Sequence, residues 1–295
     1  MRSSLRAKQL AKPSYFGGKQ SLTDWIGQQV ACHLPRETWS NLTFVDAFLG
    51  GGAMSLFAKA AGFKQLVVND CSYRSQLIAQ AFLLNQQLRL SRRELLFLNQ
   101  PLPPEALRLL ETNYAPSVFS TRHAQRLDQW LYWARQMQDP TRQALCLILI
   151  WHCINAFRCY PTSRGTSNGP YAQALDGLRS WDSINPKRFQ DGTVERLLKP
   201  PLAILEAKLE AVNQGVFSGP PVVAYQQDVL SFLPAITGDV VYLDPPYAGT
   251  QSYEEGFALV DELLFAEKPA LPITDFSTQV EALHALLDSS QGTSA

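Results

Sequence analysis

The segment from residue 43 to residue 70 constrains the fold more than any other part of the sequence. An apolar, strand-like run at 43–48 leads into a glycine turn at 50–52, a stretch of helical composition at 53–61 and a second apolar run at 65–70. Two buried parallel strands need a crossover connection between them, and a helix is the usual one. The sequence therefore predicts a βαβ unit and an α/β fold with a parallel sheet.

This unit carries a candidate ligand site. A glycine turn after a first strand lets a ligand approach the backbone closely, and Asp70, ending the second strand, can accept hydrogen bonds from ribose hydroxyls. Asp46, Gly50 and Gly52 complete the pattern. The pattern is not GxGxxG and glycine turns are common, so a nucleoside ligand and a tight structural turn both remain open.

A second motif follows the strand-like run at 239–243, which leads directly into Asp244, Pro245, Pro246 and Tyr247. Two consecutive prolines cannot continue a central strand, so the chain must leave the sheet on a rigid, extended course. A carboxylate, a backbone carbonyl and an aromatic ring then lie together at the carboxyl edge of the sheet, where α/β folds bind ligands. Such a set can accept both hydrogens of an exocyclic amine and stack on its ring. A proline turn capped by aspartate is the structural alternative.

The middle of the chain differs from both ends. Prolines and arginines punctuate predicted helices at 124–137 and 142–154, and strand signals resume only at 222–225, after a predicted helix at 202–212. We therefore expect three parts: a cofactor-binding part at 1–88, an inserted and mainly helical lobe at 89–200, and a catalytic part at 201–295.

The formal net charge of zero hides an uneven distribution. Residues 1–88 carry 9 basic and 4 acidic side chains, residues 89–208 carry 16 and 10, and residues 209–295 carry 1 and 12. The first two blocks could present a basic face to a phosphate backbone, and most of the middle positives are arginines, which make forked contacts. A solvated surface of mixed charge explains the same numbers.

Other features narrow the class of protein. The five cysteines form no CxxC pair and no apolar run is long enough to span a bilayer, so we expect no metal site, no disulfide framework and no membrane segment, and a cytoplasmic location. His152 and the stripe of Trp130, Trp133 and Met137 are interpreted as core packing. Tyr73 and Arg74 either border a base pocket or start a surface helix.

With these motifs in order, the chain resembles the Dam-like, D12 class of adenine-specific DNA methyltransferases over most of residues 13–257. Tyr-Phe-Gly-Gly-Lys at 15–19, Phe-Val-Asp-Ala-Phe-Leu-Gly-Gly-Gly at 44–52, Asn-Asp at 69–70, Gln-Asp-Val-Leu at 227–230 and Asp-Pro-Pro-Tyr at 244–247 carry the resemblance. It implies a Rossmann-like S-adenosylmethionine-dependent methyltransferase sheet with an inserted helical target-recognition lobe. The loop at 155–171 is similar to the family's loop beside that lobe, but has Tyr160 where asparagine is common.

The resemblance also implies the site. The cofactor-binding residues are Tyr15, Lys19, Asp46, Gly50, Gly52, Asp70, Asp228 and Asp244; the catalytic residues are Asp244, Pro245, Pro246 and Tyr247; the DNA-binding residues are Arg158, Arg164, Asn168 and Tyr253. Thr250 and Phe257, with Tyr253, resemble residues that help to close over an extruded base.

The implied function is adenine-N6 methylation of double-stranded DNA at a specific site, by base flipping, in a prokaryotic or phage setting such as restriction-modification. We expect a monomer that needs no metal. Two alternatives remain: a methyltransferase acting on another amine, and a catalytically silent or truncated DNA-binding or regulatory protein of the same fold. After Tyr247 the 48 remaining residues predict a loop and a helix at 276–287, so the sheet's C-terminal strands could be missing and the edge at 239–243 exposed.

Overall fold

The computed structural model describes residues 18–158, 199–245 and 253–265. In chain order its elements are α2 (Thr23–His33), a 3-10 turn (Arg36–Asn41), β1 (Thr43–Asp46), α3 (Ala53–Ala61), β2 (Gln65–Asn69), α4 (Tyr73–Ile78), a π-helical turn (Ala79–Leu83), α5 (Arg92–Leu98), α6 (Leu109–Tyr114), α7 (Thr121–Arg135), α8 (Pro140–Phe157), α11 (Pro201–Gln214), β3 (Val222–Tyr225), α12 (Val229–Phe232), a 3-10 turn (Leu233–Ala235), β4 (Val240–Tyr242) and α13 (Tyr253–Phe265).

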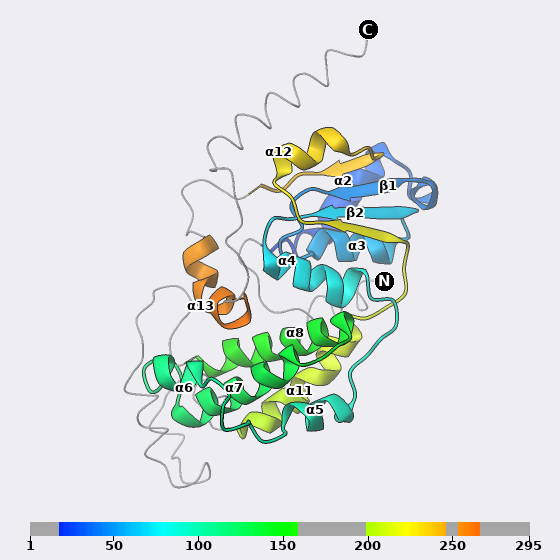
Figure 1. Ribbon diagram of the computed structural model, residues 1–295. Helices are drawn as coiled ribbons and strands as arrows, with labels where there is room; N and C mark the ends of the chain where they lie inside the picture. Colours follow the sequence, from blue (N-terminus) through cyan, green and yellow to red (C-terminus); the bar gives the residue numbers. More distant parts are fainter. Residues whose placement is uncertain (1–17, 159–198, 246–252, 266–295) are drawn as a thin grey trace, which may run out of the picture.

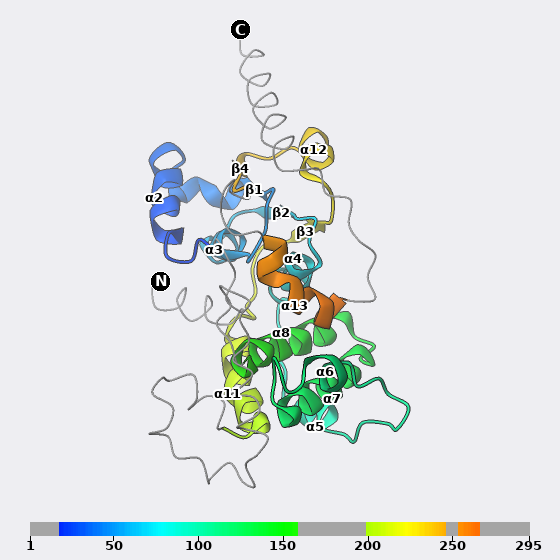
Figure 2. The ribbon, with the colours of Figure 1, turned by 90° about the vertical axis from the view of Figure 1, so that its left-hand side faces the viewer.

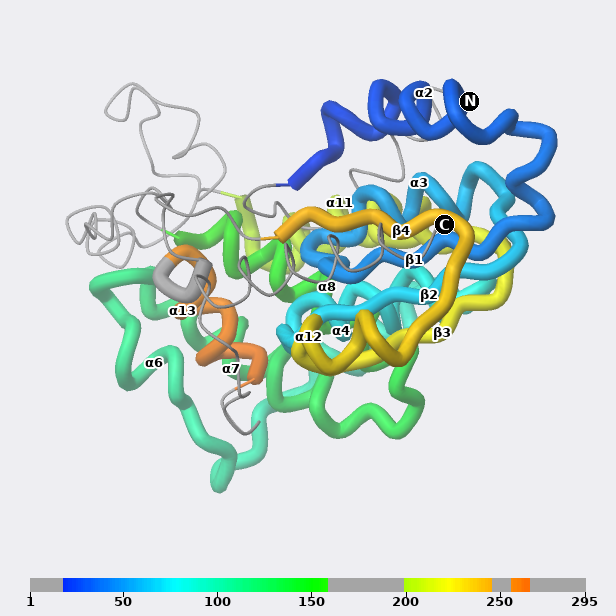
Figure 3. The backbone as a smooth tube through the Cα atoms, turned by 90° about the horizontal axis from the view of Figure 1, so that it is seen from above, coloured from blue at the N-terminus to red at the C-terminus, as the bar shows by residue number. Residues whose placement is uncertain are grey.

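The strands form one parallel sheet in the order β3-β2-β1-β4, which confirms the predicted α/β class (Figure 3). Successive strand residues alternate between two cores. Phe44 and Val68 join the large core on the side of α3 and α4, whereas Val45 and Val67 join a smaller core under α12 (Figure 1). The central strands β1 and β2 are therefore buried between helices on both faces, as in most parallel sheets, whereas the outer strands β3 and β4 are partly exposed.

The predicted middle block is helical in the part that the structure describes. α8 is apolar on nearly every face and packs against α7, α11 and α4, so it forms the centre of the lobe. Its buried residues belong to the same contiguous core as those of the sheet. Trp130 of α7 is fully buried, as expected for a packing residue. Trp133 of α7 and Met137, just after it, pack against the same core, and His152 of α8 is half-buried. The exact domain limits stay a prediction.

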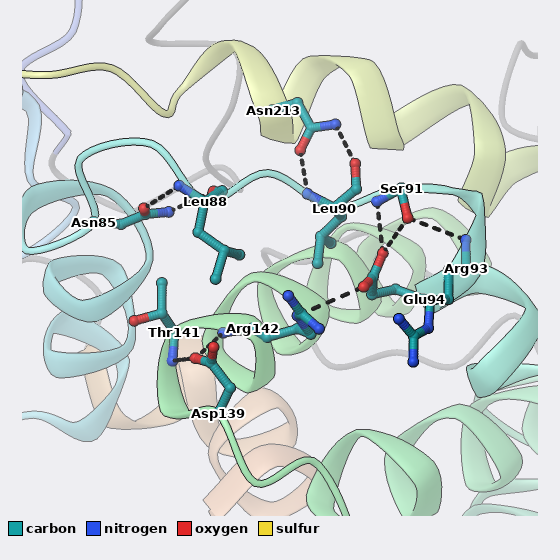
Figure 4. Close-up of polar contacts among 10 residues, drawn as sticks. All are labelled: Asn85, Leu88, Leu90, Ser91, Arg93, Glu94, Asp139, Thr141, Arg142 and Asn213. Atoms are coloured by element: carbon teal, nitrogen blue, oxygen red, sulfur yellow. Dashed lines mark hydrogen bonds and ion pairs between the residues drawn. The ribbon is translucent and has the colours of Figure 1, made fainter.

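The lobe is attached through a set of side-chain hydrogen bonds where the chain enters and leaves it (Figure 4). The Asn213 amide accepts from the Leu90 N–H at 2.9 Å and donates to the Leu90 carbonyl at 2.8 Å. Next to this pair, Ser91 and Glu94 form a capping box that starts α5, and Glu94 also pairs with Arg142 of α8 at 3.5 Å. These contacts tie α11, α5 and α8 together at one point.

The sequence predicts a helix at about 75–88, after the second strand, and in the structure this helix is shorter. α4 ends at Ile78 and continues as a π-helical turn, because the buried Lys59 ammonium takes the carbonyls of Phe82 at 2.7 Å and Asn85 at 2.8 Å. A cation that satisfies the last carbonyls of a helix stabilises its end there. α13 lies where a loop was expected, and the helix predicted at 276–287 falls outside the described residues.

Candidate active site

The carboxyl ends of β2, β1 and β4 lie side by side at one edge of the sheet. Asp46 pairs with Tyr242 in the β1–β4 register, and the Ala47 N–H donates to the Tyr242 carbonyl at 3.2 Å. Asp244 is two residues beyond Tyr242, and Asp70 directly follows β2 on the other side of β1. Three carboxylates from distant parts of the sequence are thus gathered at the edge where α/β sheets bind ligands.

The glycine turn is held by Asp70. Gly50 and Gly52 have φ angles of 48° and 71°, which residues other than glycine rarely adopt. One Asp70 carboxylate oxygen accepts from the Gly50 N–H at 2.7 Å and the other from the Ser72 N–H at 2.8 Å. A Cβ on Gly52 would lie 3.0 Å from the Ile78 side chain. The turn therefore needs glycine both for its conformation and for the space beside α4.

Two buried or half-buried amides fix the ends of three strands, and sequence reasoning did not assign either of them a role. The Asn69 side chain donates to the carbonyls of Ala47 at 3.3 Å and Gln227 at 3.1 Å, and accepts from the Gln227 N–H at 3.1 Å. The Gln76 amide donates to the carbonyls of Asp70 at 3.0 Å and Tyr225 at 2.6 Å. These hydrogen bonds therefore join the ends of β1, β2 and β3, where Asp46 and Asp70 lie.

Asp46 lies behind the turn with 1% of its surface exposed. One carboxylate oxygen accepts from the Ser55 hydroxyl at 2.6 Å, and the other has no hydrogen-bond partner among the described residues. Burial raises the pKa of Asp46 to about 7; the Ser55 hydroxyl and, more weakly, the Phe48 backbone N–H oppose this shift, and the nearby charges of Asp70 and Asp244 add to it. Asp46 can therefore take up a proton near neutral pH or respond to a cation that binds close to it.

Lys19 and Asp244 form an ion pair of 2.7 Å in which the two side chains are 16% and 18% exposed. The aromatic-x-Gly-Gly-Lys segment and the Asp-Pro-Pro-Tyr segment are thus brought together by their lysine and their aspartate. Pro245 follows Asp244 within the described chain, whereas Tyr15, Pro246 and Tyr247 lie outside it.

Asp228 lies at the same edge, a few residues after β3, and therefore beyond β2 as seen from β1. Its carboxylate caps α12 by accepting from the Leu230 N–H at 2.9 Å. Its predicted cofactor contact stays a prediction.

The predicted DNA-binding residues are described only in part. Arg158 ends α8 with 5% of its surface exposed, and Tyr253 begins α13. Arg164 and Asn168 lie outside the described residues. Phe257 is buried against Trp151 rather than open to a base. Direct DNA contacts by these residues stay predictions.

The lobe also carries an open cavity of about 510 Å³, lined in part by Arg108, Arg122 and Arg126. Glu111 and Asp128 also line it; Glu111 pairs with Arg108 at 3.3 Å, and Asp128 accepts from two backbone N–H groups that begin α6. Three arginines against two acids give the lining a net formal charge of +1.

Other chemistries find little support in the described part of the chain. It contains no group of three or more His, Cys, Asp or Glu side chains that could hold a metal, and no helix there is long and apolar enough to cross a membrane. Burial raises the pKa of the Cys71 thiol to about 12 and raises those of Cys146 and Cys153 further, so these thiols are poor nucleophiles.

The sequence profile of the D12 class of N6 adenine-specific DNA methyltransferases matches residues 15–191 and 175–271. The chain belongs to this family. It is 27% identical over 260 residues to the type II methyltransferase M2.HphI of Haemophilus parahaemolyticus, covering 87% of this chain and 72% of that protein. It is 24% identical over 263 residues to the type II methyltransferase M.NlaIII of Neisseria lactamica, covering 85% and 68%. No solved structure matches the chain.

Membership of the D12 class makes the chain an adenine-specific DNA methyltransferase, with DNA as its substrate and a methyl donor as its second reactant. The same matches do not favour the catalytically silent alternative or another acceptor amine.

Proposed function

We propose that the methyl donor is S-adenosylmethionine, bound against the Gly50–Gly52 turn, and that Asp244 is the first acceptor of hydrogen bonds from the adenine amine. The adjacency of Asp244 to this turn, across the β1–β4 pair, is the observation that carries the proposal. Neighbouring strand ends support the proposal, because a donor at the turn and an amine at Asp244 would then meet at one edge of the sheet.

The residues at this edge fit such a donor. S-adenosylmethionine carries two cationic groups, a sulfonium and an ammonium. Asp70 and Asp244 lie near enough to Asp46 that their charges raise its pKa. A cation there would relieve the repulsion among the carboxylates and compensate the buried Asp46 oxygen that has no hydrogen-bond partner in the described chain. Each Asp70 oxygen accepts one backbone N–H and has a second lone pair for a ribose hydroxyl.

When bound, S-adenosylmethionine supplies an electrophilic methyl group. The adenine must leave the helix to reach it, because its amine is paired within the duplex. The Asp244 carboxylate and the Pro245 carbonyl then accept the two amine hydrogens, so that the nitrogen lone pair points toward the methyl carbon. The amine nitrogen would gain the methyl group as the sulfonium–methyl bond breaks, with that bond's electron pair staying on sulfur in the departing thioether. The nitrogen then loses one proton toward Asp244 and on to solvent. Tyr247 stacks on the base in this proposal.

Lys19 has a positioning role in this scheme. Its ammonium binds one Asp244 carboxylate oxygen at 2.7 Å, so it restricts the position of the carboxylate that is proposed to accept from the amine. Pro245 restricts the backbone just after Asp244, so the carboxylate and the next carbonyl stay in a fixed relation.

The test is methyl transfer from tritiated S-adenosylmethionine to duplex DNA. Asp244→Asn should lower the single-turnover rate by at least about a hundredfold, because a carboxylate acceptor is lost at the reacting centre. Asp239→Asn is the matched control: it lies at the start of the same strand and accepts from the Thr43 N–H at 2.7 Å, away from the site. Equal rates for wild type and Asp244→Asn would refute the role.

The donor is tested separately by photocrosslinking labelled S-adenosylmethionine and mapping the labelled peptide, which we expect to contain Gly50–Gly52 or Asp70. Methylome sequencing of cells that express the chain would give the DNA word. We also propose that the enzyme acts as a monomer in the cytoplasm, where the described free thiols would stay reduced.

A further inference from the structure

Arg74 makes a joint between two helices that have no sequence proximity. It belongs to α4, is 7% exposed, and its guanidinium pairs with Asp261 of α13. The same guanidinium lies over the Phe257 ring, with its central carbon 4.2 Å from the ring centroid. A planar cation that pairs at its edge and stacks on its face fixes both distance and orientation, which a lysine ammonium cannot do.

On one side the joint is anchored to the glycine turn. The Asp70 carboxylate that holds the Gly50 N–H also holds the N–H of Ser72, the residue that caps α4. The side-chain amide of Gln76, two residues after Arg74, donates a hydrogen bond to the Asp70 carbonyl. Arg74 is therefore part of a short backbone segment whose position is set by the same acid that sets the turn.

On the other side the joint holds α13, the first described element after Asp244 and Pro245. Figures 1 and 2 show α13 between the sheet and the lobe. Phe257 also packs edge-on against Trp151 of α8, with ring centroids 6.2 Å apart, and the Leu263 carbonyl accepts from Arg135 of α7 at 2.9 Å. α13 thus contacts the lobe while Arg74 connects it to the turn.

The pair is desolvated mainly on the arginine side, because the Arg74 side chain is 9% exposed and that of Asp261 is 38% exposed. Burial raises the pKa of Asp261, and the Arg74 charge opposes that shift. Removing Asp261 would take a carboxylate partner from a buried guanidinium, which is costly. The ion pair and the ring contact together therefore relate α13 to α4.

We propose that Arg74 is a positioning residue for methyl transfer: through Asp261 and Phe257 it holds α13, the first described element after Asp244 and Pro245, in register with the glycine turn. The inference rests on the proposed function of Asp244 and the turn.

The kinetic test compares Arg74→Lys, Asp261→Asn and the double variant with wild type, using Arg93→Lys as the control, since Arg93 is exposed on α5. We expect Arg74→Lys to lower the single-turnover rate, normalised to active sites titrated with S-adenosylmethionine, by about tenfold, because small misplacements are costly in positioned reactions. The dissociation constant for S-adenosylmethionine should stay within about threefold. The double variant should be no slower than the worse single variant, since both remove one interaction.

A merely structural Arg74 predicts something different: a lower melting temperature and fewer active sites, with the rate per site unchanged. A rate per site within about twofold of wild type in folded Arg74→Lys, or single effects that multiply in the double variant, would overturn the proposal.

A second readout needs no catalysis. Hydrogen exchange of the backbone amides of 256–265 should slow when S-adenosylmethionine binds to wild type, and this protection should be lost in Arg74→Lys and kept in Arg93→Lys. If wild type binds the donor and shows the protection but methylates no DNA, the proposed function fails and the joint stands. If donor binding leaves these amides unchanged in an active enzyme, the joint is refuted and the function stands.

Discussion

At the scale of single residues, Asp46 is the most informative group of the site. Its folded-state pKa of about 7 lies above the ordinary value of 3.8, so the folded protein binds this proton more tightly than the unfolded chain does. The corresponding stabilisation is complete below about pH 4 and is lost as the pH rises through about 7. Relative to Asp46→Asn, which cannot ionise, wild type should therefore lose stability across this range, by a few kcal/mol at most.

Urea unfolding of both proteins at intervals from pH 4.5 to pH 8 measures this difference. Ser55→Ala gives an internal check: the Ser55 hydrogen bond lowers the Asp46 pKa, so its removal should raise that pKa further and extend the loss of stability to higher pH. Parallel pH profiles for wild type and Asp46→Asn would show that Asp46 does not carry the shifted proton.

Single residues also show which parts of the site a sequence can predict. Asp46, Gly50, Asp70 and Asp244 were found because motifs at strand ends must meet at one edge of a parallel sheet. Asn69 and Gln76 were not assigned a role, since their partners, Gln227 and Tyr225, lie about 150 residues away and a lone amide has no local signature.

At the scale of elements, the turn between β1 and α3 allows a matched pair of substitutions. Gly52 and Gly62 both have positive φ angles, of 71° and 83°, at opposite ends of α3. A Cβ on Gly62 would meet nothing within 4 Å, whereas one on Gly52 would lie 3.0 Å from Ile78. Gly62→Ala should cost only the backbone strain, about 1 to 2 kcal/mol.

Gly52→Ala should cost more than Gly62→Ala and should also weaken S-adenosylmethionine binding by about tenfold or more, because the turn must shift to make room. Thermal unfolding and calorimetric titration of both variants separate the two effects. Equal donor affinities in the two variants would argue against a donor at this turn.

α13 shows why one element was missed. Phe257, Val260, Leu263 and Leu264 are buried and have helical spacing, so the signal was present in the sequence. Loop residues were expected after the two prolines, and the partners that stabilise this short helix, Arg74 and Trp151, belong to distant segments. The strands and the long helices α7, α8 and α11 were predicted because their apolar runs are continuous or strongly periodic, whereas the short helices α5 and α6 were not predicted.

At the scale of the whole molecule, the Asn213 amide connects α11, the helix that follows the lobe, to Leu90 at the start of the lobe. Asn213→Ala leaves the N–H and carbonyl of buried Leu90 without these two bonds, at an expected cost of about 1 to 3 kcal/mol. Asn213→Asp keeps the acceptor but turns an oxygen toward the Leu90 carbonyl, so it should cost at least as much at neutral pH. Gln214→Ala, exposed on the same helix, should change the unfolding free energy by less than about 0.5 kcal/mol.

Among the described strands, β4 is the outer strand on one side of the sheet, and Asp244 follows it in the chain. Val241 of β4 is 48% exposed, whereas Val68 of β2 is fully buried. The same substitution at both sites therefore reports whether this edge is open in solution. Val68→Thr buries a hydroxyl and should cost about 1 to 3 kcal/mol, and Val241→Thr less than about 0.5 kcal/mol.

Denaturant unfolding at several protein concentrations gives both values. If Val241→Thr costs as much as Val68→Thr at every concentration, the β4 edge is covered within the chain itself. A cost that appears only as the concentration rises would mean that a second copy covers it, since association stabilises by mass action. The open edge instead predicts a small, concentration-independent cost, with the strand that presents Asp244 held on one side by β1 alone among the described strands.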